Sequence, residues 1–217
     1  MKSYRILSLT LLILILSACS SPLLSADVLP WVSDEPILFK DDFQLQQGGW
    51  TTRDDLFSFS GYDHGSFRLR TTMPNYQIWS VPGLQFSNTQ VYVRAEKLNG
   101  PDDNLLGLIC RYQNESNFYA FVISSDGYYG IYKRAGENLA LIDQDHLDFS
   151  EVIVQGEGVN RLSALCYEDQ LSLIVNDTLL LQVEDSSFVY GDVGMIVGNF
   201  EQGGVDILFD QFIVVKR

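Results

Sequence analysis

Beyond Pro36, this sequence has no long segment in which apolar residues recur with the period of a helix. It consists of short runs rich in β-branched and aromatic residues, separated by Gly, Asn, Asp and Ser. The clearest runs lie at residues 65–73, 89–97, 104–112, 118–124, 128–134, 161–167, 171–175, 179–183, 193–199 and 205–215. Strands of this length and spacing predict an all-β fold made of two packed antiparallel sheets.

The connections between the runs carry hairpin signals, which fall at Asn114–Asn117, Ser125–Gly127, Glu168–Asp169 and Asn176–Asp177. Within the runs, Phe67–Arg70 alternates apolar and basic residues, as a strand with one buried face does. Leu105–Cys110 does not alternate, so we expect it to be an inner strand covered on both faces.

The start of the chain predicts a targeting segment. Lys2 and Arg5 precede or flank Ile6–Leu16, a largely apolar run of eleven residues. As a helix, this run would span about 16 Å, roughly half of a ~30 Å hydrocarbon core, so it indicates a signal peptide and not a membrane span.

The four residues Leu16–Cys19 (LSAC) resemble the bacterial lipobox. The resemblance implies cleavage after Ala18 and lipidation of Cys19, and two or more acyl chains hold a protein stably at a bilayer. The chain would then comprise a signal peptide (1–18), the lipidated cysteine with a flexible tether (19–36) and one domain (37–217). This interpretation places the protein in the bacterial cell envelope, outside the cytoplasm; the alternative is an ordinary secretory signal.

The charge balance limits the partners. The 217 residues contain 14 Lys plus Arg against 28 Asp plus Glu, a formal net charge of −14. Nucleic acids and anionic lipid headgroups are bound through cationic surfaces, so neither is expected as the main partner, and the membrane is expected to be reached through the lipid anchor alone.

Several segments resemble one fold family. They are Phe39–Phe43 (FKDDF), 107–134 (GLICRYQNESNFYAFVISSDGYYGIYKR), 160–177 (NRLSALCYEDQLSLIVND), 188–200 (FVYGDVGMIVGNF) and 207–214 (ILFDQFIV). Together they resemble bacterial concanavalin A-like domains related to the LamG, family-16 glycoside hydrolase and 3-keto-disaccharide hydrolase-like groups. The resemblance covers about residues 37–217 and implies a jelly-roll sandwich, a scaffold that hosts lectins, enzymes and adhesion modules. Asn176-Asp177 replaces the family's Asn-Gly turn, which Asp can still support because it tolerates positive φ.

Catalytic carboxylates are not evident. Retaining glycosidases hold two carboxylates ~5 Å apart, and on this fold they lie on one strand with the spacing Glu-x-Asp-x-x-Glu, which this sequence lacks. The pairs Asp41-Asp42, Asp54-Asp55 and Asp102-Asp103 are adjacent, so in a strand they would point to opposite faces, and we expect surface or turn roles for them. The sequence therefore favours a protein that is not an enzyme.

Metal ligands are sparse. His146 follows Asp143 and Asp145, but a zinc site needs three or four convergent ligands, so a solvated loop is expected. A structural calcium ion is conceivable where the first and last strands could pair, with Asp41 or Asp42 near Asp210. No other cofactor is expected.

Aromatic residues are the remaining functional candidates. Sugar rings stack on Trp and Tyr while polar groups bond their hydroxyls, which suggests a ligand site formed from Trp79, Arg111, Tyr119, Tyr128 and Tyr132. The alternative is that these residues pack the core and the sheet faces.

Three functions follow from these observations. The first is a lipid-anchored, non-catalytic binding module outside the cytoplasm, for a glycan or another cell-surface polymer. The second is a glycan-processing enzyme of the 3-keto-disaccharide hydrolase type, and the third is a structural or accessory lipoprotein that contacts protein partners.

The cysteines predict one disulfide. If Cys19 is acylated, Cys110 and Cys166 remain in a chain exported to a compartment where disulfides persist. Proteins of the resembling family often have cysteines at both places, which implies a bridge between them. The alternative is two buried free thiols that act as small hydrophobes.

Overall fold

The computed structural model describes residue 32 and residues 35–217. They form an antiparallel all-β jelly-roll sandwich, which confirms the predicted fold class. The strands are β1 Ile37–Asp41, β2 Arg53–Asp54, β3 Ser58–Asp63, β4 Ser66–Thr71, β5 Gln77–Ser80, β6 Thr89–Asn99, β7 Asn104–Asn114, β8 Asn117–Ile123, β9 Tyr128–Ala135, β10 Asn138–Leu141, β11 Asp148–Phe149, β12 Val159–Tyr167, β13 Gln170–Val175, β14 Thr178–Glu184, β15 Asp192–Asn199 and β16 Val205–Lys216.

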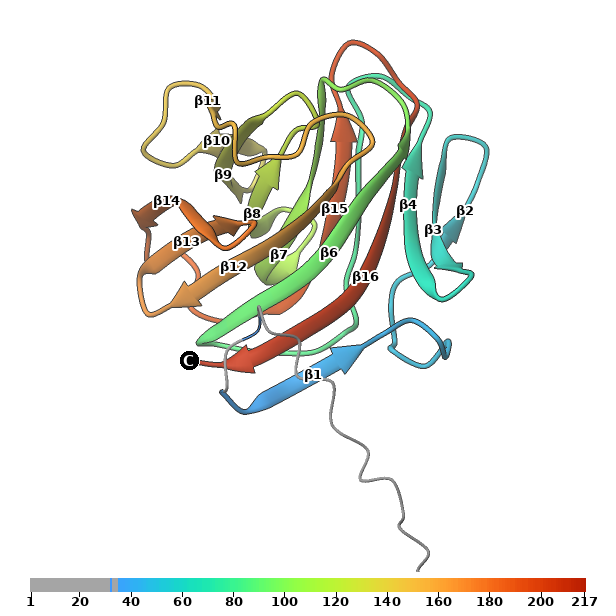
Figure 1. Ribbon diagram of the computed structural model, residues 1–217. Coiled ribbons are helices and arrows are strands. Elements are labelled where there is room, and N and C mark those ends of the chain that lie inside the picture. Colours follow the sequence, from blue (N-terminus) through green and yellow to red (C-terminus); the bar gives the residue numbers. More distant parts are fainter. Residues whose placement is uncertain (1–31, 33–34) are drawn as a thin grey trace, which may run out of the picture. The chain divides into compact units, whose positions relative to one another are not determined.

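The strands form two sheets, and the nine-stranded sheet lies in front of the other in Figure 1. Its order is β14, β13, β12, β6, β16, β4, β3, β2, and β1 also pairs with β16. The seven-stranded sheet has the order β10, β9, β8, β7, β15, β5, with β11 beside β9. Neighbours such as β6 and β16 are far apart in sequence, which is how a jelly roll interleaves its strands.

All the strands expected from the β-rich runs are present, with ends that differ by a few residues. The opening segment Phe39–Phe43 overlaps β1, which pairs with β16 as the first and last strands were expected to do. The sequence did not predict the short strands β2, β3, β5, β10 and β11, because none of them has an alternation of apolar and charged residues as clear as that of β4.

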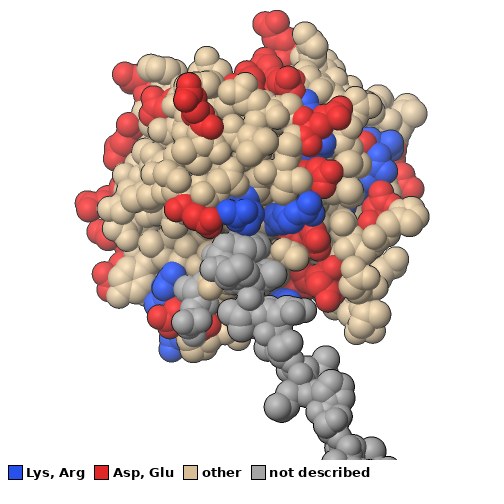
Figure 2. Space-filling view, viewed as in Figure 1, with Lys and Arg blue, Asp and Glu red and all other residues tan. Residues whose placement is uncertain are grey.

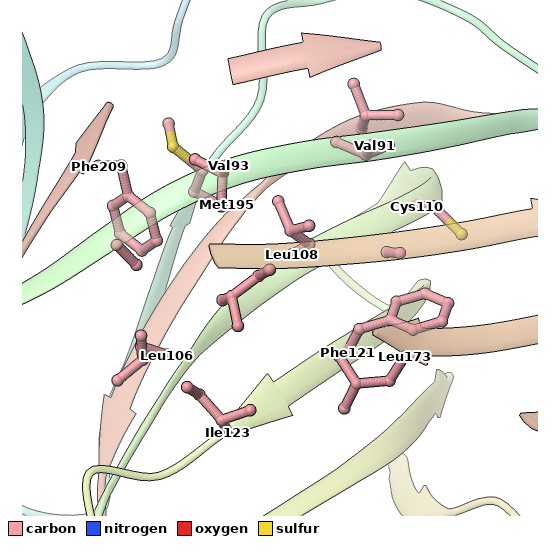
Figure 3. Packing of buried hydrophobic residues seen from close by; sticks show 14 of the residues in the cluster. Val91, Val93, Leu106, Leu108, Cys110, Phe121, Ile123, Leu173, Met195 and Phe209 are labelled. Carbon is pink, nitrogen blue, oxygen red and sulfur yellow. The ribbon is translucent and has the colours of Figure 1, made fainter. Parts of the chain in front are cut away.

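The core lies between the sheets, and Figure 3 shows side chains from several strands meeting there. On β4, Phe67 and Leu69 are fully buried while Arg68 and Arg70 are turned the other way, as their alternation predicted. The run Leu105–Cys110 is buried on both faces, which confirms that β7 is an inner strand. Leu106, Leu108 and Cys110 join the core, whereas Leu105 and Ile109 join a separate apolar cluster on the outer side of the sheet.

A disulfide joins Cys110 and Cys166, as predicted. Cys110 lies on β7 of the seven-stranded sheet and Cys166 lies on β12 of the nine-stranded sheet, so the bond cross-links the two layers. The two Cα atoms are 6.8 Å apart, and both residues belong to the core.

The Asn176–Asp177 hairpin joins β13 to β14, and both residues have positive φ (48° and 67°). A two-residue turn with two positive φ values matches the right-handed twist of the strands it connects. The expectation that this hairpin forms without a glycine is therefore confirmed.

The outer face of the nine-stranded sheet carries mixed charge. Arg68 pairs with Asp206 (2.5 Å), and Arg94 lies between Glu96 (3.5 Å) and Asp210 (4.0 Å). Figure 2 shows acidic and basic side chains close together on this face. Neighbouring side chains of opposite charge are typical of a sheet face that is exposed to solvent.

The signal peptide (1–18), Cys19 and most of the expected tether (19–36) lie outside the described residues. Within the described part of the chain, there is no helix long and apolar enough to cross a bilayer.

Candidate functional site

The outer face of the seven-stranded sheet carries an apolar cluster that no second sheet covers. Because side chains alternate along a strand, β8 sends Tyr119 and Phe121 to the core and Phe118, Ala120 and Val122 outward. The outward residues combine with others into a cluster of Leu105, Ile109, Phe118, Ala120, Val122 and Ile196. Partly buried residues pack on this cluster: Trp79, Tyr112, Tyr132, Leu147 and Phe200. The result is an apolar floor with aromatic rings at its surface.

A cleft of about 540 Å³ opens over one side of this floor, within the size range of ligand pockets. We call it the Trp79 cleft. It is lined by Thr51, Arg53, Ser60, Asn75, Tyr76, Gln77, Ile78, Trp79, Val81, Tyr112, Glu115, Arg134, Leu139, Asn199 and Phe200. These residues come from seven strands of the two sheets and from the loops beside them, so only the folded sandwich brings them together.

Trp79 is held in this cleft by its neighbours. The guanidinium carbon of Arg134 lies 5.7 Å from the centre of the Trp79 ring and 5.6 Å from that of Phe118. The Trp79 and Phe118 rings are themselves 5.5 Å apart, and Tyr112 lies 5.8 Å from Phe118. Ring pairs at these separations attract one another, and a cation over a ring adds to this attraction. Trp79 therefore presents a positioned aromatic surface to the cleft.

Polar groups surround the aromatic surface. Arg53 Nη1 donates to the Tyr76 hydroxyl (3.2 Å), and the Tyr76 N–H donates to Asn199 Oδ1 (3.5 Å). Asn199 is 3% exposed, and its Nδ2 has no hydrogen-bond partner among the described residues. Glu115 is the one carboxylate among the residues that line this cleft.

A second cleft, the Tyr128 cleft, adjoins the first and has a volume of about 620 Å³. Its lining is Asn75, Asp103, Ser124, Asp126, Tyr128, His146, Leu147, Phe200 and Glu201, so Asn75 and Phe200 border both clefts. Tyr128 is 41% exposed, and its ring meets Phe149 edge to face at 5.5 Å.

The two clefts differ in charge. Asp103, Asp126 and Glu201 line the Tyr128 cleft, whereas Arg53 and Arg134 line the Trp79 cleft and outnumber its one carboxylate, Glu115. Burial raises the pKa of Asp126, and the nearby charges of Asp103 and Asp102 raise it further. The groove formed by the two clefts is therefore basic at one end and acidic at the other.

The structure brings together some of the predicted ligand residues and separates others. Trp79 and Tyr128 line the two clefts, while Tyr132 packs on the apolar floor and lines neither. Arg111 and Tyr119 do not reach the clefts, because they are 2% and 0% exposed.

Tyr119 and Arg111 instead hold a crossing segment in place. The Tyr119 hydroxyl donates to Asp185 Oδ1 (2.5 Å) and accepts from the Phe188 N–H (3.1 Å). Burial, reinforced by the hydrogen bond to Asp185, raises the pKa of Tyr119 to about 12. Arg111 Nη1 donates to the Phe188 carbonyl (2.8 Å), so both residues fasten the segment that connects β14 to β15.

Sequence reasoning missed Arg53, Tyr76, Arg134 and Asn199. Arg134 could have been found, because it is two residues beyond Tyr132 and thus on the same face of β9. Tyr76 immediately precedes β5, which has four residues, and Arg53 is the first of the two residues of β2, and both strands are too short for their pattern to assign a face.

The residues of the expected calcium site are engaged with the protein. Asp41 is buried, so it does not have the expected surface role, but it accepts from the Phe43 N–H two residues further on (2.7 Å), which is a turn contact, and it also accepts from Trp50 Nε1 (2.9 Å). Asp210 accepts from the Gln211 N–H (2.8 Å), and its pKa is raised by burial and, in smaller part, by the charge of Asp42. No group of three or more His, Cys, Asp or Glu that could hold a metal occurs in residues 32 and 35–217, and the calcium site stays a prediction.

No protein-family profile and no curated protein matches this sequence. Solved structures do resemble the fold. The carbohydrate binding module CBM66 from Bacillus subtilis has a TM-score of 0.65 and 14% identity, over 77% of this chain and 96% of that chain. A protein of unknown function with a galectin-like fold from Bacillus subtilis has a TM-score of 0.59 and 12% identity, over 85% and 99%. A GH16 protein of a Bacteroides ovatus mixed linkage glucan locus, in complex with a product, has a TM-score of 0.58 and 12% identity, over 82% and 100%. At these identities the likeness concerns the fold.

Proposed function

We propose that this protein is a non-catalytic glycan-binding module that is held at the cell envelope by a lipid on Cys19 and works outside the cytoplasm. The observation that carries the proposal is the Trp79 cleft, where a half-buried indole lies among hydrogen-bonding groups on an open sheet face. The lipobox sequence supports a lipid anchor on Cys19, and the Trp79 cleft supports a glycan as the ligand.

The chemistry of the cleft matches a sugar. A sugar ring has an apolar face of C–H groups and a rim of hydroxyls, so it is recognised by an aromatic surface beside donors and acceptors. Trp79 supplies that surface, while Gln77, Asn199 and Tyr76 supply amide and hydroxyl groups around it. Small-ligand pockets combine apolar surface with a few placed polar groups, and the lining of this cleft contains both.

The lining of the cleft favours binding over hydrolysis. Glycosidases of the retaining and inverting kinds both need a pair of carboxyl groups that flank the scissile bond. Glu115 is the one carboxylate that lines the Trp79 cleft. The other carboxylates nearby line the Tyr128 cleft, which shares only Phe200 and Asn75 with the first. Similar folds occur in a carbohydrate binding module and in a GH16 protein, so the scaffold is compatible with both functions.

The proposal is tested by screening the full-length protein, in detergent, on a glycan array. We expect a restricted set of glycans to bind and Trp79→Ala to lower their affinity by about 30-fold, the size of effect seen for central aromatic contacts. Tyr190→Ala is the matched control, because Tyr190 is an exposed aromatic that lines neither cleft.

Two outcomes would replace the proposal. A blank array would favour the accessory lipoprotein that contacts protein partners. Turnover of a bound glycan that is abolished by Glu115→Gln would favour a glycan-processing enzyme.

The anchor has its own test. Growth of the host with a labelled fatty acid should tag the wild type, and Cys19→Ala should leave the protein untagged and released from the membrane fraction. A wild-type protein that is itself untagged would remove the anchor from the proposal.

A further inference from the structure

Two arginines, Arg53 and Arg134, line the Trp79 cleft without forming a salt bridge among the described residues. Arg53 bonds the Tyr76 hydroxyl and Arg134 lies over the Trp79 ring. Three arginines of the nine-stranded sheet that lie outside the cleft, Arg68, Arg94 and Arg161, each form a salt bridge with at least one carboxylate, although Arg70 on β4 forms none within the described part of the chain. In a chain with twice as many acidic as basic residues, two guanidinium groups that share one cleft and form no salt bridge favour an anionic ligand.

Asn199 adds a buried donor to the same cleft. Its side chain is 3% exposed, and its Oδ1 faces the Tyr76 N–H, which can only donate. This orientation leaves Nδ2 as the free end, without a partner among the described residues. A buried N–H group without a partner is unfavourable, so a small movement of the cleft wall that brought Nδ2 to a ligand oxygen would be favoured by the new hydrogen bond.

We propose that the Trp79 cleft takes an acidic sugar, whose carboxylate or sulfate pairs with Arg53 and Arg134 while its ring lies on Trp79. This inference rests on the glycan-binding function proposed above and names the class of ligand. Guanidinium groups suit both oxyanions, because their paired N–H groups match two oxygens of either one.

The adjoining Tyr128 cleft gives the ligand a direction. Its lining includes Asp103, Asp126 and Glu201, which repel an anion. A bound oligosaccharide that extends past Phe200 therefore places its acidic residue at the arginine end and a neutral residue at the Tyr128 end.

The net charge of −14 does not prevent this pairing. At physiological ionic strength, charges more than about 8 Å apart are largely screened, so the approach of an anion is slowed while the contacts inside the cleft decide its affinity. Affinity for the acidic sugar should accordingly fall as salt is added.

The experiment measures the affinity of the full-length protein for two matched pairs of probes. One pair is an aldotetraouronic acid, with one glucuronic acid on a xylotriose, and xylotriose itself. The other is a sulfated carrageenan tetrasaccharide and its desulfated form. The readout is the ratio of acidic to neutral affinity, which reports on charge and not on the integrity of the fold.

We expect a ratio of about 10 or more in at least one pair, the value of one charge-assisted hydrogen bond. The pair that shows it distinguishes a carboxylate from a sulfate ligand. Arg53→Gln and Arg134→Gln should bring the ratio close to one. Arg94→Gln is the control of equal charge outside the cleft, and it should leave the ratio unchanged.

Ratios near one in both pairs, or a preference that survives both cleft variants, would overturn the proposal. If neutral sugars still bind and Trp79→Ala weakens their binding as expected above, the glycan-binding function stands and only the acidic class fails. If no probe and no array glycan binds, both proposals fail.

Discussion

The guanidinium group of Arg134 lies over the indole ring of Trp79, 5.7 Å from its centre. Trp79 belongs to β5 at the edge of the seven-stranded sheet and Arg134 to β9 near the other edge, so the contact spans the outer face of that sheet. A ring held in this way loses little side-chain freedom when a ligand stacks on it, which favours binding. The same contact leaves the N–H groups of Arg134 at the cleft.

The first prediction concerns this contact. Arg134→Met keeps an apolar side chain over Trp79 but removes the cation, and a cation–π contact at a partly exposed site contributes about 0.5 to 1 kcal/mol. We expect affinity for a neutral array glycan to fall about two- to fivefold, measured by isothermal titration calorimetry. An unchanged affinity would show that the ring is positioned by Phe118 alone.

The second prediction concerns the disulfide between Cys110 and Cys166, which links the two sheets. Its sequence separation of 56 residues means that the bond restricts the unfolded chain strongly. Replacing both cysteines with alanine should lower the free energy of unfolding by about 2 to 4 kcal/mol in urea titrations. Verified reduction of the wild type serves as the control and should give a similar loss; two titratable thiols at Cys110 and Cys166 in the unreduced protein would contradict the bond.

The third prediction is a pH dependence that comes from Asp192 at the start of β15. Asp192 is 5% exposed, and burial raises its pKa from 3.8 to about 6 despite hydrogen bonds from the N–H groups of Val193 and Gly83. Between these two pH values, the native state binds more protons than the unfolded state, so the free energy of unfolding falls as pH rises from about 4 to 6.

Asp192→Asn removes this titration. Urea unfolding at several pH values should show that the variant lacks part of the decline seen in the wild type between pH 4 and 6. A difference between the two proteins that stays constant over this range would contradict the assignment.

The fourth prediction has the opposite sign and comes from Asp185. Burial by itself would raise the pKa of this carboxyl, but hydrogen bonds from Lys133, Ser187 and Tyr119 outweigh burial and hold the pKa well below its usual range. Asp185→Asn should therefore destabilise the protein at pH 7, and the difference should shrink as pH falls below about 4, where the wild-type carboxyl starts to lose its advantage.

Tyr119→Phe is the companion variant, because it removes one of these hydrogen bonds and leaves the ring. A hydrogen bond to a charged group contributes about 2 kcal/mol, so a loss of this order is expected at pH 7. A neutral effect of both variants would show that the segment between β14 and β15 is held by packing of Phe188 alone.

The alternation within the sequence was enough to assign the long strands. Phe67 and Leu69 against Arg68 and Arg70 define the buried face of β4 wherever that strand lies in the sheet, because side chains alternate in every strand. The run Leu105–Cys110, in which apolar residues do not alternate with polar ones, similarly predicts a strand that is buried on both faces. These assignments depend only on local pattern and on the removal of apolar surface from water.

The position of an aromatic residue relative to a ligand surface has no such local signal. Phe118 and Tyr119 are adjacent and both aromatic. Phe118 belongs to the apolar floor beneath the cleft, whereas Tyr119 is buried on the other face and its hydroxyl donates to Asp185. The strand pattern says that they face opposite ways, but which way is outward depends on the sheet that packs behind β8.

The sequence by itself determined the fold class, the long strands and, with its family resemblance, the pairing of Cys110 with Cys166, because these depend on residue type and short-range periodicity. Tertiary structure decided that Trp79, Arg53, Arg134 and Asn199 share one cleft while Arg111 and Tyr119 do not. The reason is physical: the cleft is assembled from strands that pair only when the jelly roll closes, so the distance between its side chains is set by sheet order and not by separation along the chain.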